Sequence, residues 1–160
     1  MTNLETWRQV FRAAALKLEL ASVDLDDNGN CSIVSSEAAL PNINIAFDEE
    51  FGIADIFSEL GTVPESDPDV YRELLFDNLF CEKTKGATYA AARATGRIVL
   101  QRAFEVKSAD DGEALAVALA DFAEAAYAGR RLIYRSVLGE ETADDQKDAM
   151  PGLFTHNLSI

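Results

Sequence analysis

Histidine and cysteine are scarce in this 160-residue sequence, and their scarcity excludes two classes of site. The one histidine is His156, and the two cysteines, Cys31 and Cys81, form no Cys-x-x-Cys pair. A zinc site made of His and Cys side chains is therefore hard to assemble within one chain. A Ser-His-Asp or Cys-His nucleophile would have to recruit His156. We interpret both cysteines as free thiols in or near the core, as expected in a reducing compartment.

Basic residues are also few, with 14 Lys and Arg against 28 Asp and Glu, so the formal net charge is −14. Such a charge repels phosphate backbones and anionic membrane faces, so neither a nucleic-acid partner nor membrane insertion is predicted. No apolar run approaches the ~20 residues of a membrane helix. The first residues also lack the basic start and apolar stretch of a signal peptide. We therefore expect a cytoplasmic protein whose partners present basic or apolar surfaces.

Nucleotide-binding and calcium-binding motifs are absent or incomplete. Neither G-x-x-x-x-G-K-[ST] nor G-x-G-x-x-G occurs, and no cofactor is predicted. Residues 24–29, DLDDNG, match the first half of a calcium loop, but the twelfth position is Ser35 instead of glutamate. An acidic turn with Gly29 at positive φ is the favoured interpretation.

Paired carboxylates are the other candidates for catalysis. They fall in predicted turns or at a helix start, where solvated charge is the expected role, and no histidine lies near either cysteine in sequence. We therefore predict no catalytic residue, no metal ligand and no enzyme. The pairs considered are Asp26/Asp27, Glu49/Glu50 and Asp110/Asp111.

Hydrophobic periodicity predicts an α+β fold with a twisted antiparallel sheet and flanking helices. Residues 1–138 form the predicted domain, and 139–160 form an acidic C-terminal tail that we expect to be flexible. The predicted elements are a helix over 4–20, three strands within 31–35, 42–47 and 51–60, a helix over 68–80, two strands within 87–93 and 97–106, and a helix over 110–134.

The predicted helix over 68–80 is apolar around most of its circumference. Asp67 is its candidate N-cap and Pro68 its candidate first residue. A helix on one side of a small sheet needs only one apolar stripe. Either a second subunit covers its other side, which we favour, or the helix is wholly internal.

Several short stretches follow one another in an informative order. They are DDNGNCSI at 26–33, NIAFD at 44–48, LGTVP at 60–64, LLFDNLF at 74–80 with GAT at 86–88, and GRIVLQ at 96–101. In this order, and with this size and acidity, they resemble the class I chaperones of type III secretion, the Tir chaperone family. The resemblance covers about residues 4–134.

The resemblance implies a homodimer that performs no chemistry. Such chaperones bind the N-terminal segment of one or a few secreted effector proteins in extended form, in apolar grooves and by strand addition. An alternative is a non-enzymatic regulator of the same fold that sequesters a control protein, and a small enzyme is a further rival. The resemblance suggests dimer contacts at Leu74, Leu75, Asn78, Leu79 and Phe80, and effector contacts at Phe11, Ile33, Ile43, Ile45, Phe47 and Ile56.

Overall fold

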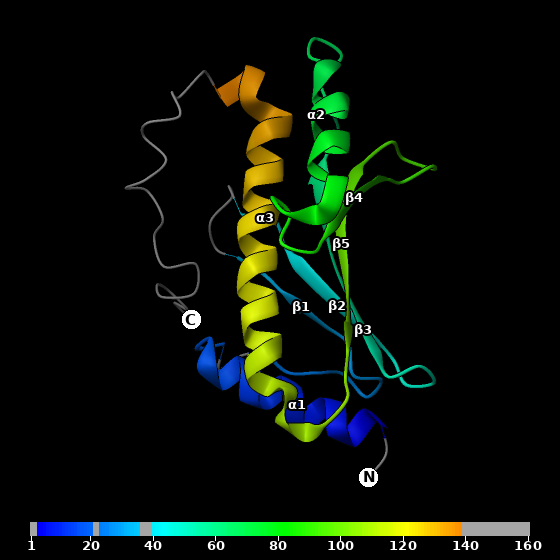
Figure 1. Cartoon of the computed structure of the whole chain (residues 1–160), viewed down its shortest axis with the longest axis vertical. Helices are drawn as coiled ribbons and strands as arrows, with labels where there is room; N and C mark the ends of the chain where they lie inside the picture. Colours follow the sequence, from blue (N-terminus) through cyan, green and yellow to red (C-terminus); the bar gives the residue numbers. More distant parts are fainter. Residues whose placement is uncertain (1–2, 21–22, 36–39, 139–160) are drawn as a thin grey trace.

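The computed structural model describes residues 3–20, 23–35 and 40–138, and its elements follow the predicted α+β order (Figure 1). His156 and the rest of the predicted tail over 139–160 lie outside the described residues. The elements are α1 (Asn3–Lys17), β1 (Cys31–Ile33), β2 (Ile43–Asp48), β3 (Ile53–Gly61), α2 (Asp69–Asp77), η1 (Leu79–Cys81), β4 (Thr88–Ala91), β5 (Ile98–Glu105), η2 (Ala109–Asp111) and α3 (Gly112–Leu138).

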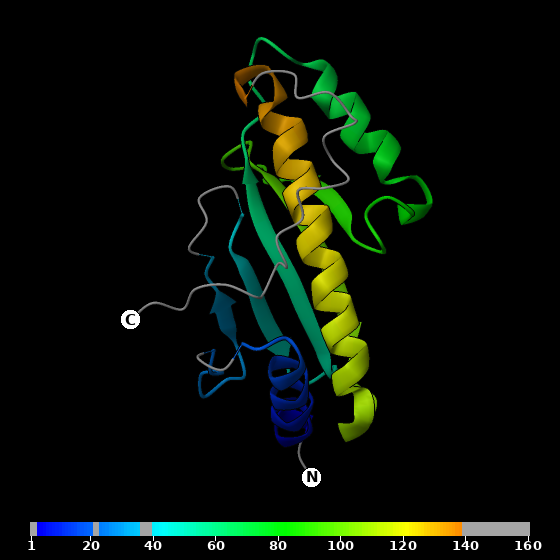
Figure 2. The ribbon, with the colours of Figure 1, turned by 90° about the vertical axis from the view of Figure 1, so that its left-hand side faces the viewer.

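The strands form one antiparallel sheet in the order β1-β2-β3-β5-β4. Buried and more exposed residues alternate along β2 and β3, which is typical of strands with one face on the core. Figure 2 shows α3 along one face of the sheet, with α2 beside the C-terminal part of α3. The opposite face carries exposed residues such as Ala46, Asp55 and Ala103. The fold therefore leaves one sheet face without a helix among the described residues.

Helix α1 is fixed to the sheet through Trp7. The Trp7 ring stacks on Phe47 with centroids 5.2 Å apart, and its Nε1 donates a hydrogen bond of 2.7 Å to the Gly29 carbonyl. Gly29 has the predicted positive φ, at 84°, and a Cβ there would lie 2.8 Å from Leu4. Asp26 closes this turn by accepting hydrogen bonds from two backbone amides, so the segment is the acidic turn that we expected.

Helix α3 contributes the centre of the core. The helix has an apolar stripe at helical spacing that is buried throughout: Leu115, Leu119, Phe122, Ala126 and Ile133. Ser108 and Asp111 form a capping box before it, with Ser108 as the N-cap. The helix continues to Leu138, beyond the predicted end near residue 134.

The predicted helix over 68–80 is shorter in the structure. It ends at Asp77, and Leu79–Cys81 form a separate 3-10 turn. Pro68 is the residue that precedes the helix, and Asp67 does not cap it, because the Asp67 carboxylate accepts hydrogen bonds from Arg135. The helix is also not wholly internal, since Leu75 and Phe76 are exposed.

Within the described ranges, no helix has the length and apolar character needed to cross a bilayer.

Candidate functional site

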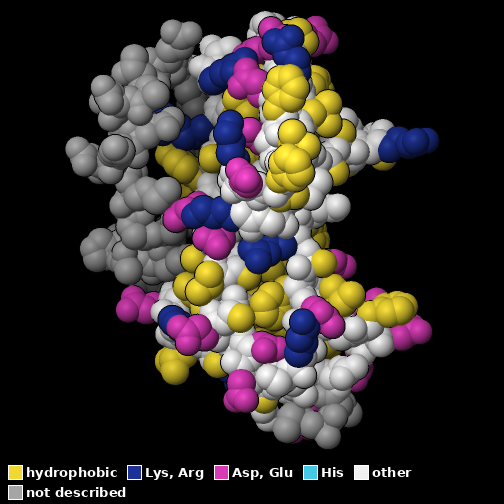
Figure 3. Space-filling model, in the orientation of Figure 1, with side chains coloured by type: hydrophobic (Ala, Val, Ile, Leu, Met, Phe, Trp, Pro, Cys, Tyr) yellow, Lys and Arg dark blue, Asp and Glu magenta, His cyan; other side chains and the backbone are white. Residues whose placement is uncertain are grey.

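A cluster of exposed hydrophobic side chains covers α2 and η1. We call it the α2 patch, and Figure 3 shows it in the upper part of the molecule, where hydrophobic side chains gather. Its side chains are 44% to 83% exposed. Soluble proteins that act as monomers rarely expose a large continuous apolar patch. Such a patch indicates a surface that another protein covers. Its members are Tyr71, Leu75, Phe76, Leu79 and Phe80.

The chain geometry after α2 presents Phe80 to solvent. Phe80 and Cys81 both have left-handed backbones, with φ of 59° and 51°. A bulky residue rarely adopts this conformation, which costs about 1–3 kcal/mol and persists only where the surroundings impose it. Here Asn78 imposes it. Its side chain accepts a hydrogen bond of 2.7 Å from the Tyr89 amide and donates one of 2.9 Å to the Tyr89 carbonyl.

Ion pairs attach both ends of this segment to α3. At the start, Arg135 donates to both carboxylate oxygens of Asp67, at 2.7 and 3.0 Å, and to Glu73 at 2.6 Å. The hydrogen bonds from Arg135 lower the pKa of Asp67. At the end, Lys85 pairs with Glu124 and with Asp121, and these contacts raise the pKa of Lys85. The α2 patch is therefore carried on a segment whose orientation α3 determines.

The dimer-interface candidates divide into two groups. Leu75, Leu79 and Phe80 belong to the α2 patch, while Leu74 is buried in the core of its own chain and Asn78 is bound to Tyr89. Leu74 and Asn78 thus anchor the segment that carries the patch, instead of forming part of its surface. Sequence reasoning did not select Tyr71 and Phe76 as contacts, although the all-round apolar pattern of the helix contained the signal for both.

The effector-binding candidates are all buried in this chain: Phe11, Ile33, Ile43, Ile45, Phe47 and Ile56. They lie on the helix-covered face of the sheet or on α1, and most of them belong to β1 and β2. Their role in effector contact stays a prediction. Periodicity identifies the buried face of a strand well but cannot distinguish a core residue from the floor of a groove.

Two surface features close to these residues were not predicted. Strand β1 lies at the edge of the sheet, and Val34, directly after it, is 70% exposed. On the open face of the sheet, Phe57 and Val99 are only half-buried. An edge strand presents backbone groups that can pair with another chain.

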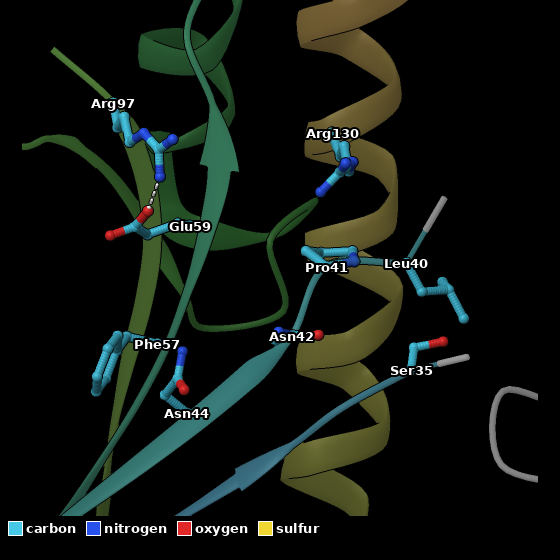
Figure 4. A pocket seen from close by; sticks show the side chains of 9 residues that line it. All are labelled: Ser35, Leu40, Pro41, Asn42, Asn44, Phe57, Glu59, Arg97 and Arg130. Carbon is cyan, nitrogen blue, oxygen red and sulfur yellow. Dashed lines mark hydrogen bonds and ion pairs between the residues drawn. The ribbon is translucent and has the colours of Figure 1, made fainter. Parts of the chain in front are cut away.

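A polar cleft of about 410 Å³ lies where β2 begins, between α3 and the end of β3 (Figure 4). Arg97 and Glu59 form an ion pair of 2.5 Å on one side of it, and Arg130 extends from α3 on the other. The full lining is Ser35, Leu40, Pro41, Asn42, Asn44, Phe57, Glu59, Arg97 and Arg130.

Neither cysteine is part of a disulfide, and both are half-buried free thiols. Burial raises the pKa of Cys31 to about 12, with a smaller contribution from the nearby Asp26 charge. A neutral thiol is a poor nucleophile at physiological pH. Within the described ranges, no group of three or more His, Cys, Asp or Glu side chains is placed to hold a metal ion.

Comparison with known proteins gives one family match. The sequence model of the Tir chaperone protein (CesT) family matches residues 12–130, which is most of the chain. A search of curated proteins finds no significant match.

Solved structures share the fold. A chain of the ExsC–ExsE complex has a TM-score of 0.64 and 18% identity, and the alignment covers 83% of this chain and 97% of that one. A chain of the HopA1–SchA chaperone–effector complex has a TM-score of 0.62 and 16% identity, covering 81% and 95%. A chain of the heterodimeric ExoU–SpcU complex, from the type III secretion system of Pseudomonas aeruginosa, has a TM-score of 0.57 and 23% identity, covering 77% and 96%.

Proposed function

The chain belongs to the Tir chaperone protein (CesT) family, and from this membership we propose that it binds the N-terminal segment of a secreted effector in extended form and keeps it soluble and competent for type III secretion. The family match over residues 12–130 carries this proposal. As a member of this chaperone family, the chain is not an enzyme. We place the protein in the cytoplasm, where it would meet effectors before export.

The functional unit in this proposal is a homodimer. The α2 patch supports it, because several large side chains exposed on one segment are the usual core of an interface between subunits. Leu75, Leu79 and Phe80 would make the central contacts. Leu74 and Asn78 would hold the backbone on which these side chains stand.

The effector segment would contact the β1 side of the sheet and α1. A strand added at β1 would continue the sheet, and alternate side chains of that strand would come next to Ile33. The remaining candidates are buried in the core and would form the apolar floor beneath: Phe11, Ile43, Ile45, Phe47 and Ile56. The net charge of −14 favours a segment with basic residues and keeps the loaded complex soluble.

Isolation of the complex from its native cell, followed by limited proteolysis, tests this function. The expected result is a protected fragment within the first ~100 residues of a secreted protein, bound without a globular fold of its own. A Val34→Asp variant should weaken capture of that fragment, whereas Val117→Asp, an equally charged change on exposed α3, should leave it unchanged.

The alternative functions give different results. Protection of a control protein that is never exported would favour the regulator of the same fold. Binding of a folded domain through a surface that neither variant affects would contradict the proposal.

A further inference from the structure

Arg130 differs from the other arginines in and near the polar cleft in its lack of an ion-pair partner among the described residues. It is half-buried on α3, and no carboxylate of the described residues lies within ion-pair distance of it. Its neighbours are satisfied: Arg97 pairs with Glu59, and Arg135 pairs with Asp67 and Glu73. In a chain with twice as many acidic as basic residues, an unpaired guanidinium in a recess is unexpected.

The aromatic ring of Tyr134 supports this guanidinium. The Arg130 Cζ atom lies 5.8 Å from the centre of that ring, one helical turn further along α3. Tyr134 is itself seated against Gly61, where a Cβ atom would lie only 2.1 Å from the tyrosine hydroxyl oxygen. Stacking orients the guanidinium but leaves its N–H donors free to bind an acceptor.

The rest of the cleft suits one carboxylate on an extended peptide. The side-chain amides of Asn42 and Asn44 add hydrogen-bonding groups, and the ring of Phe57 adds an apolar wall. The carboxylate of Glu59 in the same lining disfavours a doubly charged phosphate. The last paired residues of β2 and β3 are Asn44 and Phe57, and β3 continues without β2 as its neighbour to Gly61. The cleft therefore lies beside the part of β3 that β2 leaves unpaired.

We propose that this cleft is a binding site for a glutamate or aspartate side chain on an extended peptide segment, with Arg130 as its principal contact. In a surface that otherwise attracts basic segments, such a site selects one acidic position and so fixes the register of the bound chain. The carboxylate comes either from a bound effector segment or from the acidic residues 140–148 of this chain. The inference deepens the proposed function, but its test needs no effector, so the two can fail separately.

The test uses the full chain and two capped pentapeptides, acetyl-Thr-Val-Glu-Val-Thr-amide and its glutamine analogue. NMR titration follows the Nε–Hε resonance of Arg130, assigned by its loss in Arg130→Gln, together with the backbone amides of Asn42 and Asn44. The glutamate peptide should bind at least about fivefold more tightly than the glutamine peptide, the gain expected of a half-exposed charge-assisted pair.

Matched charge changes make the result specific. Arg130→Gln should abolish the preference for glutamate, whereas Arg93→Gln, which removes the same charge from the exposed β4–β5 turn, should retain it. Equal binding of the two peptides to the native chain, or an equal loss in both variants, would overturn the proposal.

A further variant of the full chain identifies the source of the carboxylate. If residues 140–148 occupy the cleft, their neutralisation should shift the Arg130 resonance without peptide and tighten peptide binding. If the source is an effector, neither should change. Either source is compatible with the site, provided that the native chain binds the glutamate peptide more tightly than the glutamine peptide. The substitutions are Glu140→Gln, Glu141→Gln, Asp144→Asn, Asp145→Asn and Asp148→Asn.

Discussion

Gly61 illustrates how a single residue position sustains both the fold and the polar cleft. Its φ of 128° is open to glycine but strained for other residues, and Tyr134 fills the space that a side chain would need. We expect Gly61→Ala to lower the free energy of unfolding by about 2–4 kcal/mol, from backbone strain combined with overpacking. Urea denaturation measures this loss.

The matched control for this change is Gly96→Ala. Gly96 also has a positive φ, 68°, but nothing lies within 4 Å of its missing Cβ. Gly96→Ala therefore introduces backbone strain without a steric clash, and it should lower the free energy of unfolding clearly less than Gly61→Ala does. Equal losses in the two variants would show that the Tyr134 contact contributes nothing.

Among single residues, those governed by local rules were predictable from sequence. The positive φ of Gly29 and the cap at Ser108 follow from turn and capping chemistry within a few positions. The left-handed backbone of Phe80 was not predictable, because it depends on Asn78 binding the backbone of Tyr89 on another element. The partnership of Asp67 with Arg135 joins residues even further apart in sequence.

Helix α2 depends on α3 for its position. Few side chains of α2 are buried, namely Val70 and Leu74, so the bidentate contact from Arg135 to Asp67 is a main constraint on where the helix starts. We expect Arg135→Gln to increase amide hydrogen exchange across residues 69–81 and to leave the protection of β2 and β3 unchanged. Arg93→Gln is the control of equal charge.

The same contact gives a pH dependence with a defined sign. The pKa of Asp67 is lowered in the folded chain from its ordinary value of 3.8, so the folded state favours the ionised carboxylate. The stabilisation is therefore present above pH 3.8 and is lost as the pH falls through the lowered pKa. Exchange in α2 should rise over that acidic range in the native chain and show less change in Arg135→Gln. Identical pH profiles would contradict this account.

At the level of elements, sequence patterns predicted the order, type and buried faces of the helices and strands. Period-two alternation in β2 and the apolar stripe of α3 both reappear as buried faces. The boundaries were less predictable, since α2 ends where Asn78 meets β4 and α3 continues to Leu138. The polar cleft was not foreseen, because its residues come from α3, from strands β2 and β3, and from segments next to β1, β2 and β5 that lie far apart in the sequence.

For the whole molecule, the net negative charge opposes self-association, whereas the exposed apolar surface favours it. The charge of −14 keeps separate molecules apart through long-range repulsion, so any self-association must rely on local apolar contact. The α2 patch is the concentrated source of such contact among the described residues. The sequence indicated this surface through an apolar pattern that one sheet could not cover, although which residues faced outward became evident only in the structure.

Leu79→Glu tests the homodimer directly. Leu79 is 64% exposed in the single chain, so a glutamate there stays solvated in the monomer and should leave the fold stable. In a dimer closed over the α2 patch, the carboxylate would be buried without a partner, at a cost of about 2 kcal/mol or more per subunit. Light scattering should therefore give twice the chain mass for the native protein and 17.4 kDa for the variant.

Val117→Glu is the matched control, because it places the same charge on the exposed face of α3, away from the α2 patch, and should leave the protein dimeric. If Leu79→Glu kept the doubled mass, the subunits would meet through a different surface, and α2 would then be free for the effector instead.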